Sequence, residues 1–150
     1  MSGMGAKRHT PCVRIIYVSR AKGPQTTTVT TSILLQAQVH NKVQGITGVL
    51  CQGQGFFIQV LEGERSSINA LYRRICGDLR HKDVELLRYE DISERKFSQW
   101  SMALVKLSAD DPMVKVQHPE FDPYSASGDQ VMQLLANLIQ SAQPITAPTV

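Results

Sequence analysis

Short apolar runs rich in β-branched and aromatic residues recur along this chain and predict five β-strands. The second and third runs are joined by Gln52-Gly53-Gln54-Gly55, a glycine-bearing connection with the length of a hairpin turn, so these two strands should be antiparallel. The runs cover residues 13–19, about 49–51, 56–61, 84–92 and 97–107.

Apolar residues at helical spacing predict two helices between these strands. Threonines at 26–31 can cap a first helix that closes at His40 and Asn41, and Ser66 or Ser67 can cap a second helix that ends at Gly77. The first helix has an apolar face of Val29, Ile33 and Ala37, followed by His40 or Asn41, and the second has a stripe of Ile68, Leu71, Tyr72 and Ile75.

The elements follow the order βαββαββ, and right-handed crossovers place both helices on one face of the sheet. This predicts an α+β, ferredoxin-like fold. The opposite face is also apolar and needs a cover, because it carries Ile16, Val18, Phe56, Ile58 and Val60.

The C-terminal region offers that cover. A helical turn near residues 112–117 precedes a helix over about 128–140, which Ser127 and Gln130 can start as a capping box. We expect these C-terminal helices on the second face, where the last helix packs under the sheet or against another subunit. Its wide apolar face consists of Val131, Leu134, Leu135, Leu138 and Ile139.

Two polar side chains fall in positions that should be buried. Gln59 lies in a strand that is apolar on both faces, and Tyr17 ends a row that begins with Val13 and Ile15. A buried amide without a partner costs about 1–3 kcal/mol, so Gln59 needs a polar partner inside the protein. The partner can be backbone, a ligand, or the Tyr17 hydroxyl.

Composition narrows the class of protein. A chain of 150 residues, with 42% apolar and 19% charged residues, predicts one globular domain. No run approaches the roughly 20 apolar residues of a membrane span, and the N-terminus lacks the apolar core of a secretory signal, so we expect a cytoplasmic protein. The net charge is +3, but the basic residues do not alternate with aromatic residues as they do on a nucleic-acid-binding face, which argues against nucleic-acid binding.

The three cysteines give no sign of a disulfide or metal site. Cys12, Cys51 and Cys76 form no CxxC pair and are expected to be buried thiols, with no metal.

Common catalytic and nucleotide-binding motifs are absent from the sequence, so we do not expect an enzyme. Single candidate residues also have structural explanations. Asn41 can be a left-handed helix cap, and His40 is favoured at a helix C-terminus by the dipole. Arg74 and Asp78 are spaced to form a surface salt bridge along the second helix.

Taken together, the motifs resemble a BLUF domain, the family of bacterial blue-light sensors that use a flavin. The resemblance covers about residues 13–107 in the order of the family. It consists of IIYVS in the first strand, HN at the end of the first helix, GITGVL and FFIQVLEG in the hairpin, DLRHKDVEL after the second helix, and FSQWSM in the fifth run.

This resemblance implies a flavin between the two helices and the sheet. Tyr17 would be the electron and proton donor, and Gln59 the switching amide between the phenol and the flavin. Asn41 would bond the flavin ring, and His40 would be a neighbouring pocket residue.

The resemblance also implies contacts to the flavin or its ribityl-phosphate tail from the second helix and the loop after it, and a pair of output residues in the fifth strand. FAD is the expected cofactor, with FMN or riboflavin as alternatives. The tail residues are Arg74, Asp78, Arg80 and His81, and the output residues are Trp100 and Met102, which strand alternation places on one face with Leu104.

The expected organisation is a short stand-alone sensor that signals through a downstream protein or a homo-oligomer. One alternative is a light-insensitive ferredoxin-like module that binds a ligand or a protein. Another is a small enzyme of acylphosphatase type, although no anion-cradling loop is evident after the first strand. The expected segments are a flexible N-terminal tail (1–12), the BLUF domain (13–107), a C-terminal helical cap (108–142) and a flexible C-terminal tail (143–150).

Overall fold

The computed structural model describes residues 11–141 and 144–146. Its centre is a five-stranded sheet in the order β4-β1-β3-β2-β5. All neighbouring strands are antiparallel except β2 and β5, which run parallel. The elements are β1 (Cys12–Ala21), α1 (Thr27–Gln44), β2 (Thr47–Gln52), β3 (Phe56–Glu64), α2 (Arg65–Cys76), β4 (His81–Asp91), β5 (Ala103–Lys106), α3 (Pro112–Gln117) and α4 (Gly128–Ser141).

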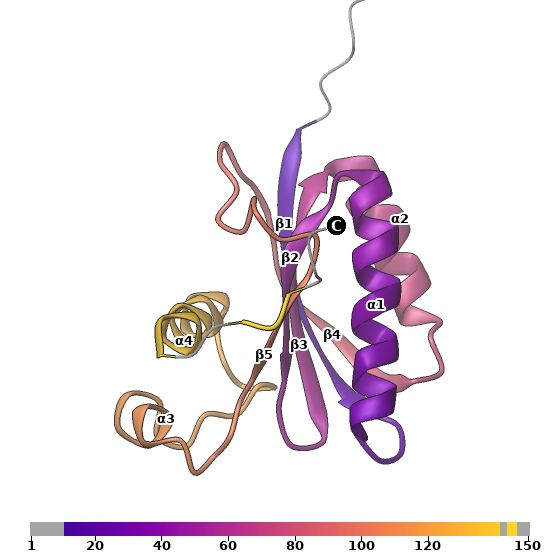
Figure 1. Cartoon of the computed structure of the whole chain (residues 1–150). Helices are drawn as coiled ribbons and strands as arrows, with labels where there is room; N and C mark the ends of the chain where they lie inside the picture. Colours follow the sequence, from indigo (N-terminus) through magenta and orange to yellow (C-terminus); the bar gives the residue numbers. More distant parts are fainter. Residues whose placement is uncertain (1–10, 142–143, 147–150) are drawn as a thin grey trace, which may run out of the picture.

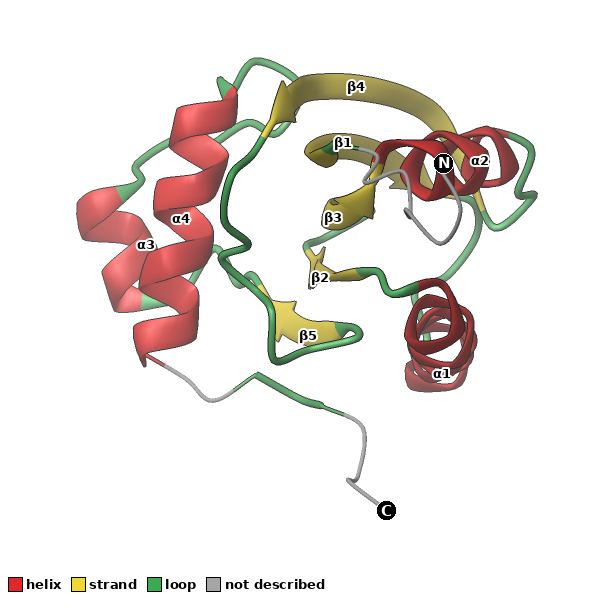
Figure 2. Cartoon of the chain, turned by 90° about the horizontal axis from the view of Figure 1, so that it is seen from above, coloured by secondary structure: helices red, strands yellow, loops and turns green. Residues whose placement is uncertain are grey.

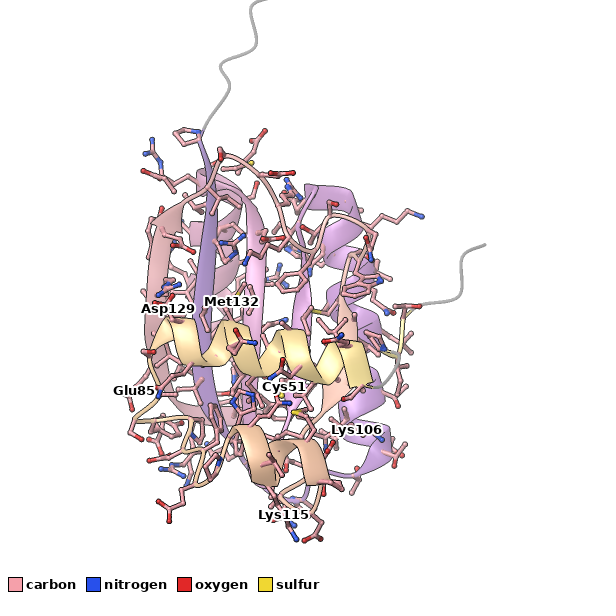
Figure 3. The ribbon with its side chains drawn as sticks, turned by 90° about the vertical axis from the view of Figure 1, so that its left-hand side faces the viewer. Cys51, Glu85, Lys106, Lys115, Asp129 and Met132 are labelled. Carbon is pink, nitrogen blue, oxygen red and sulfur yellow. The ribbon has the colours of Figure 1, made fainter. Side chains whose placement is uncertain are left out.

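Helices cover both faces of this sheet, which confirms the predicted α+β, ferredoxin-like layers. Figures 1 and 2 show α1 and α2 on one side of the sheet and α3 and α4 on the other. Figure 3 views the second side and shows α4 lying across the strands. Of the two places expected for α4, the structure has it under the sheet, and Ser127 and Gln130 form the predicted capping box.

Strand alternation divides the buried residues into two cores. The core under α1 and α2 contains Val13, Ile15 and Tyr17 from β1, as predicted from their shared face. The core under α4 contains Ile16 and Val18, together with the apolar side chains of α4. Since each side of the sheet has its own core, a change on one side reaches the other only through the strands or through a segment that passes between them.

Three helix predictions need correction. The first helix does not close at Asn41; it continues to Gln44 and ends at Gly45, whose φ of 67° gives the left-handed cap. The predicted apolar face with Ile33 and Ala37 borders a cavity and is only partly buried. The buried positions of this helix are Thr30, Leu34, Gln38 and Asn41. The second helix begins at Arg65 after Glu64 and has no side-chain cap, so neither Ser66 nor Ser67 caps it.

The predicted fifth strand was too long. Only Ala103–Lys106 is strand, and residues 97–102 form turns and bends. As a result, the expected alternation of Trp100 and Met102 on one face is wrong. Met102 is buried in the core under α1 and α2, while half-buried Trp100 packs against the core under α4.

The predicted tails were also too long where the structure describes them. Cys12 already belongs to β1, and Ile145 exchanges two backbone hydrogen bonds with Leu104 of β5. The remaining tail residues, 1–10, 142–143 and 147–150, lie outside the described residues. Of the three free thiols, Cys51 is buried, Cys12 is half-buried and Cys76 is exposed, so the expectation of burial fails for Cys76.

Among the described residues, no helix has both the length and the apolar character to cross a membrane. The same residues contain no cluster of three or more histidine, cysteine or acidic side chains that could hold a metal ion.

Candidate functional site

A cavity of about 240 Å³ opens between α1, α2 and the sheet. Every predicted photochemical or cofactor-binding residue lines it, although these residues come from five different elements and one loop. Aliphatic side chains form part of the wall, including Ile33, Leu50, Leu71 and Ile75. The predicted polar residues are Tyr17, His40, Asn41, Gln59, Arg74, Asp78, Arg80 and His81.

Tyr17 and Gln59 meet in the sheet wall of the cavity. They are directly opposite each other in the β1–β3 register, and the Tyr17 hydroxyl donates to Gln59 Oε1. Gln59 Nε2 lies 3.4 Å from Met102 Sδ, a weak acceptor. Burial, and then the charge of Asp78, raise the pKa of Tyr17 far above its usual value, so the phenol keeps its proton. The amide therefore connects a neutral phenol to the sulfur of Met102.

Asn41 reaches both the cavity and the segment before β5. Its Nδ2 donates to Ser101 O at 2.9 Å, whereas its buried Oδ1 has no hydrogen-bond partner. One turn earlier, Gln38 Nε2 donates to Met102 O at 3.0 Å. A buried acceptor without a donor is costly, so Asn41 Oδ1 is suited to a ligand N–H.

The mouth of the cavity carries a pair of arginines with different partners. Arg80 forms a bidentate contact with Asp78, which lowers the pKa of that carboxyl through hydrogen bonding. Arg74 instead lies 3.0 Å from His40 Nδ1, so the predicted Arg74–Asp78 pair is wrong. Burial, and then the charge of Arg74, lower the pKa of His40.

His81 was expected in a loop but begins β4, where it pairs with Ala21. Both of its ring nitrogens have partners: Nδ1 lies 2.7 Å from Ser19 Oγ, and Nε2 donates to Ile75 O at 2.9 Å. The histidine thus joins β1 to the last turn of α2 and helps to set the width of the cavity. Its ring lies edge-on to Tyr17, with 6.3 Å between centroids.

Two glutamines that support the site were not predicted from the sequence. Gln38 holds the Met102 carbonyl, and Gln36 Oε1 accepts from Arg80 Nη1 at 2.8 Å. The spacing of Leu34, Gln38 and Asn41 along one helical face was the available clue for Gln38, because a polar residue on that face needs a buried partner. No sequence pattern indicated the contact of Gln36.

Comparison with known proteins identifies the family. The sequence model described as "BLUF: Sensors of blue-light using FAD" matches residues 12–103, which is more than half of the chain. The chain belongs to the BLUF family. The resemblance drawn from the sequence is therefore confirmed, and so is its implication of a flavin cofactor in a blue-light sensor domain.

The curated relatives that match this chain are much longer proteins. Photoactivated adenylate cyclase subunit beta of Euglena gracilis is 33% identical over 100 residues, which are 66% of this chain and 12% of that protein. The alpha subunit is 34% identical over 96 residues, or 64% of this chain and 9% of that protein. The chain thus spans only a small part of these relatives.

Solved BLUF structures match over most of the chain. The ground state of BlsA is 28% identical, with a TM-score of 0.79, and the match covers 93% of this chain and 94% of that one. The dark state of BlrB is also 28% identical, with a TM-score of 0.73 and coverage of 88% and 97%.

The residues of the cavity fit the flavin that the BLUF family uses. Its aliphatic walls suit a planar ring system, and the orphaned Asn41 Oδ1 offers an acceptor to a ring N–H. Gln59 places a further amide in the wall, and the arginines at the mouth suit an anionic tail.

Proposed function

We propose that this chain is a blue-light photoreceptor in which Tyr17 and Gln59 carry the photochemistry of a noncovalently bound flavin. When bound, the flavin supplies a chromophore that absorbs blue light and becomes a strong oxidant. The observation that carries the proposal is the buried hydrogen bond from the Tyr17 hydroxyl to Gln59 Oε1 in the cavity wall.

Tyr17 is proposed as the residue that yields an electron and a proton. Its raised pKa keeps the phenol protonated in the dark, and the hydrogen bond points the hydroxyl proton toward Gln59 Oε1. When the electron and proton return, the Gln59 amide is left rearranged by rotation, tautomerisation or both. An amide suits this role because one end donates and the other accepts, so turning it exchanges donor and acceptor.

Asn41, Arg74 and Arg80 are proposed to hold the cofactor. Asn41 Oδ1 would accept from the ring, and the mouth of the cavity would bind the tail. Asp78 neutralises Arg80, while Arg74 contacts the imidazole of His40 rather than a carboxylate. The positive charge of Arg74 therefore favours a phosphate-bearing flavin, FAD or FMN, over riboflavin. His40 and His81 would shape the pocket beside them.

Met102 and Trp100 are proposed to relay the change. Gln59 contacts Met102 Sδ on the cavity side, and Trp100 lies only two residues away on the α4 side. The relay would reach a downstream protein or a second copy of the chain through α3 and α4. The cytoplasmic location stays a prediction.

A light-insensitive binding module is the second candidate. It is favoured by the fact that the Gln59 oxygen and nitrogen both have partners within the protein, so the buried amide does not require a ligand.

Substitutions of the two photochemical residues test the proposal. Tyr17→Phe and Gln59→Leu should retain bound flavin and lose the light-induced shift of its absorption band. Tyr124→Phe is the matched control, because this tyrosine donates to Asp83 O, outside the cavity. A normal photocycle in Tyr17→Phe or Gln59→Leu would refute the assigned roles, and a wild-type protein that cannot bind flavin would support the second candidate.

A further inference from the structure

The connection from β4 to β5 passes from one core of the protein to the other. Phe97 and Trp100 pack against the core under α4, with their rings stacked at 6.3 Å, and Met102 is buried in the core under α1 and α2. Figure 1 shows this connection at the end of the sheet where α1 finishes. Movement at the cavity can therefore reach the α4 side through this segment, provided that the segment moves as a unit.

A buried carboxylate holds the beginning of the segment. Glu62, at the end of β3, is completely buried. Its Oε2 accepts from the backbone N–H of Lys96 at 2.9 Å, and its Oε1 accepts from that of Phe97 at 2.9 Å. These contacts join residues that are more than thirty positions apart in the sequence, so they fix the loop to the strand that carries Gln59.

Arg14 holds this carboxylate in place. The guanidinium is 6% exposed and donates to Glu62 Oε2 from Nε at 3.0 Å and from Nη2 at 2.8 Å. Its Nη1 donates to Glu90 of β4 at 2.9 Å. All of the close partners of Glu62 are donors, so a neutral amide at this position could not satisfy them together.

The end of the segment is held by three carbonyl contacts. Trp100 O accepts from Gly48 N at 3.0 Å, Ser101 O from Asn41 Nδ2 at 2.9 Å, and Met102 O from Gln38 Nε2 at 3.0 Å. Since α1 and β2 grip one end and Glu62 grips the other, the loop has little freedom to absorb a displacement.

We propose that Glu62, oriented by Arg14, is a positioning residue that anchors residues 96–102, so that displacement of Met102 at the cavity moves Trp100 on the α4 side. The inference rests on the proposed photoreceptor function and adds a structural requirement for its output. Without the anchor, the loop would take up the displacement and the α4 side would not respond.

The first test uses the wild-type protein in the dark and needs no light response. Amide hydrogen exchange measured by NMR should find the Lys96 and Phe97 N–H groups protected, although Lys96 is an exposed residue. Exchange of these amides at the rate of an unprotected loop would overturn the anchor.

The second test compares Glu62→Gln with Glu90→Gln. Both substitutions remove a carboxylate that binds Arg14, but Glu90 makes no hydrogen bond to residues 96–102. Glu62→Gln should raise the exchange rate of at least one of the two amides roughly tenfold or more, because one of the two carboxylate oxygens is replaced by an NH2 group and its hydrogen bond to a charged acceptor is lost. Glu90→Gln should leave these rates unchanged.

The light-dependent readout is the fluorescence of Trp100, the single tryptophan of the chain. In flavin-loaded Glu62→Gln, the light-dark difference in this fluorescence should be lost while the flavin absorption shift persists; in Glu90→Gln both should persist. A full fluorescence difference in Glu62→Gln would overturn the inference.

If Glu62→Gln does not fold, the wild-type exchange test decides the anchor. A wild-type protein without any light response would instead overturn the proposed function, and the dark exchange rates would still report on the anchor.

Discussion

The hydrogen bond between Tyr17 and Gln59 should contribute measurably to the free energy of unfolding of the protein in the dark. Tyr17→Phe keeps the ring and removes only the hydroxyl, so it leaves Gln59 Oε1 without its donor at a site that is 5% exposed. An unsatisfied buried polar group costs about 1–3 kcal/mol. We expect Tyr17→Phe to lower the free energy of unfolding by this amount, which corresponds to about 2–4 °C in Tm for each kcal/mol.

Gln59→Leu should cost a similar amount, because it leaves the Tyr17 hydroxyl unpaired in turn. The double variant removes both groups, so its loss should be smaller than the sum of the two single losses by about 1–3 kcal/mol. Urea unfolding of the four proteins in the dark measures this coupling energy. Strictly additive losses would show that the two side chains do not interact, and would remove the physical basis of the proposed switch.

Three further predictions concern the surroundings of the site. Met102→Ala should cost about 2–5 kcal/mol as a buried large-to-small change; we expect it to keep the flavin shift and weaken the light-dependent change in tryptophan fluorescence, and an undiminished change would argue against the relay. Gly48→Ala should lower the free energy of unfolding by more than about 3 kcal/mol, because the added Cβ would overlap the Val60 carbonyl oxygen in the adjacent strand. In Gly128→Ala the atoms nearest to the added Cβ belong to a flexible arginine side chain, so urea unfolding should show a smaller loss. The pKa of His40 is lowered in the folded protein. The contribution of this histidine to stability is therefore present above its unfolded pKa of about 6.5 and is lost as the pH falls through the lower folded pKa. Wild type should lose more stability than His40→Gln between about pH 7 and pH 5, and parallel pH profiles of the two proteins would contradict this.

The fold was predictable because short-range patterns determine much of it. Alternation in β1 correctly placed Tyr17 on the same face as Val13 and Ile15, and the apolar row around Gln59 correctly indicated a buried amide. The capping box at Ser127 also marked the start of α4. Each of these features depends on residues within a few positions of one another.

The segment before β5 was not predictable in the same way. Its residues alternate like a strand, but Glu62 and Asn41 hold its backbone through contacts from distant parts of the chain. These contacts place Trp100 and Met102 on opposite sides of the sheet. A local pattern contains no information about such partners, so the alternation was misleading here.

Two further predictions about residues around the cavity were wrong. The sequence predicts an apolar face of α1 that includes Ile33 and Ala37. Both residues border the cavity, and the more fully buried positions of α1 are offset from them by one residue. Arg74 was expected to pair with Asp78 by helical spacing, yet Asp78 follows the end of α2 and turns to Arg80. Spacing rules hold within a helix and fail beyond its last turn.

The most direct test of the photoreceptor proposal is an absorption spectrum of the purified protein loaded with FAD, recorded in the dark and after blue illumination. We expect a flavin spectrum that shifts slightly to the red on illumination and returns in darkness. A flavin-loaded protein with identical spectra before and after illumination would contradict it.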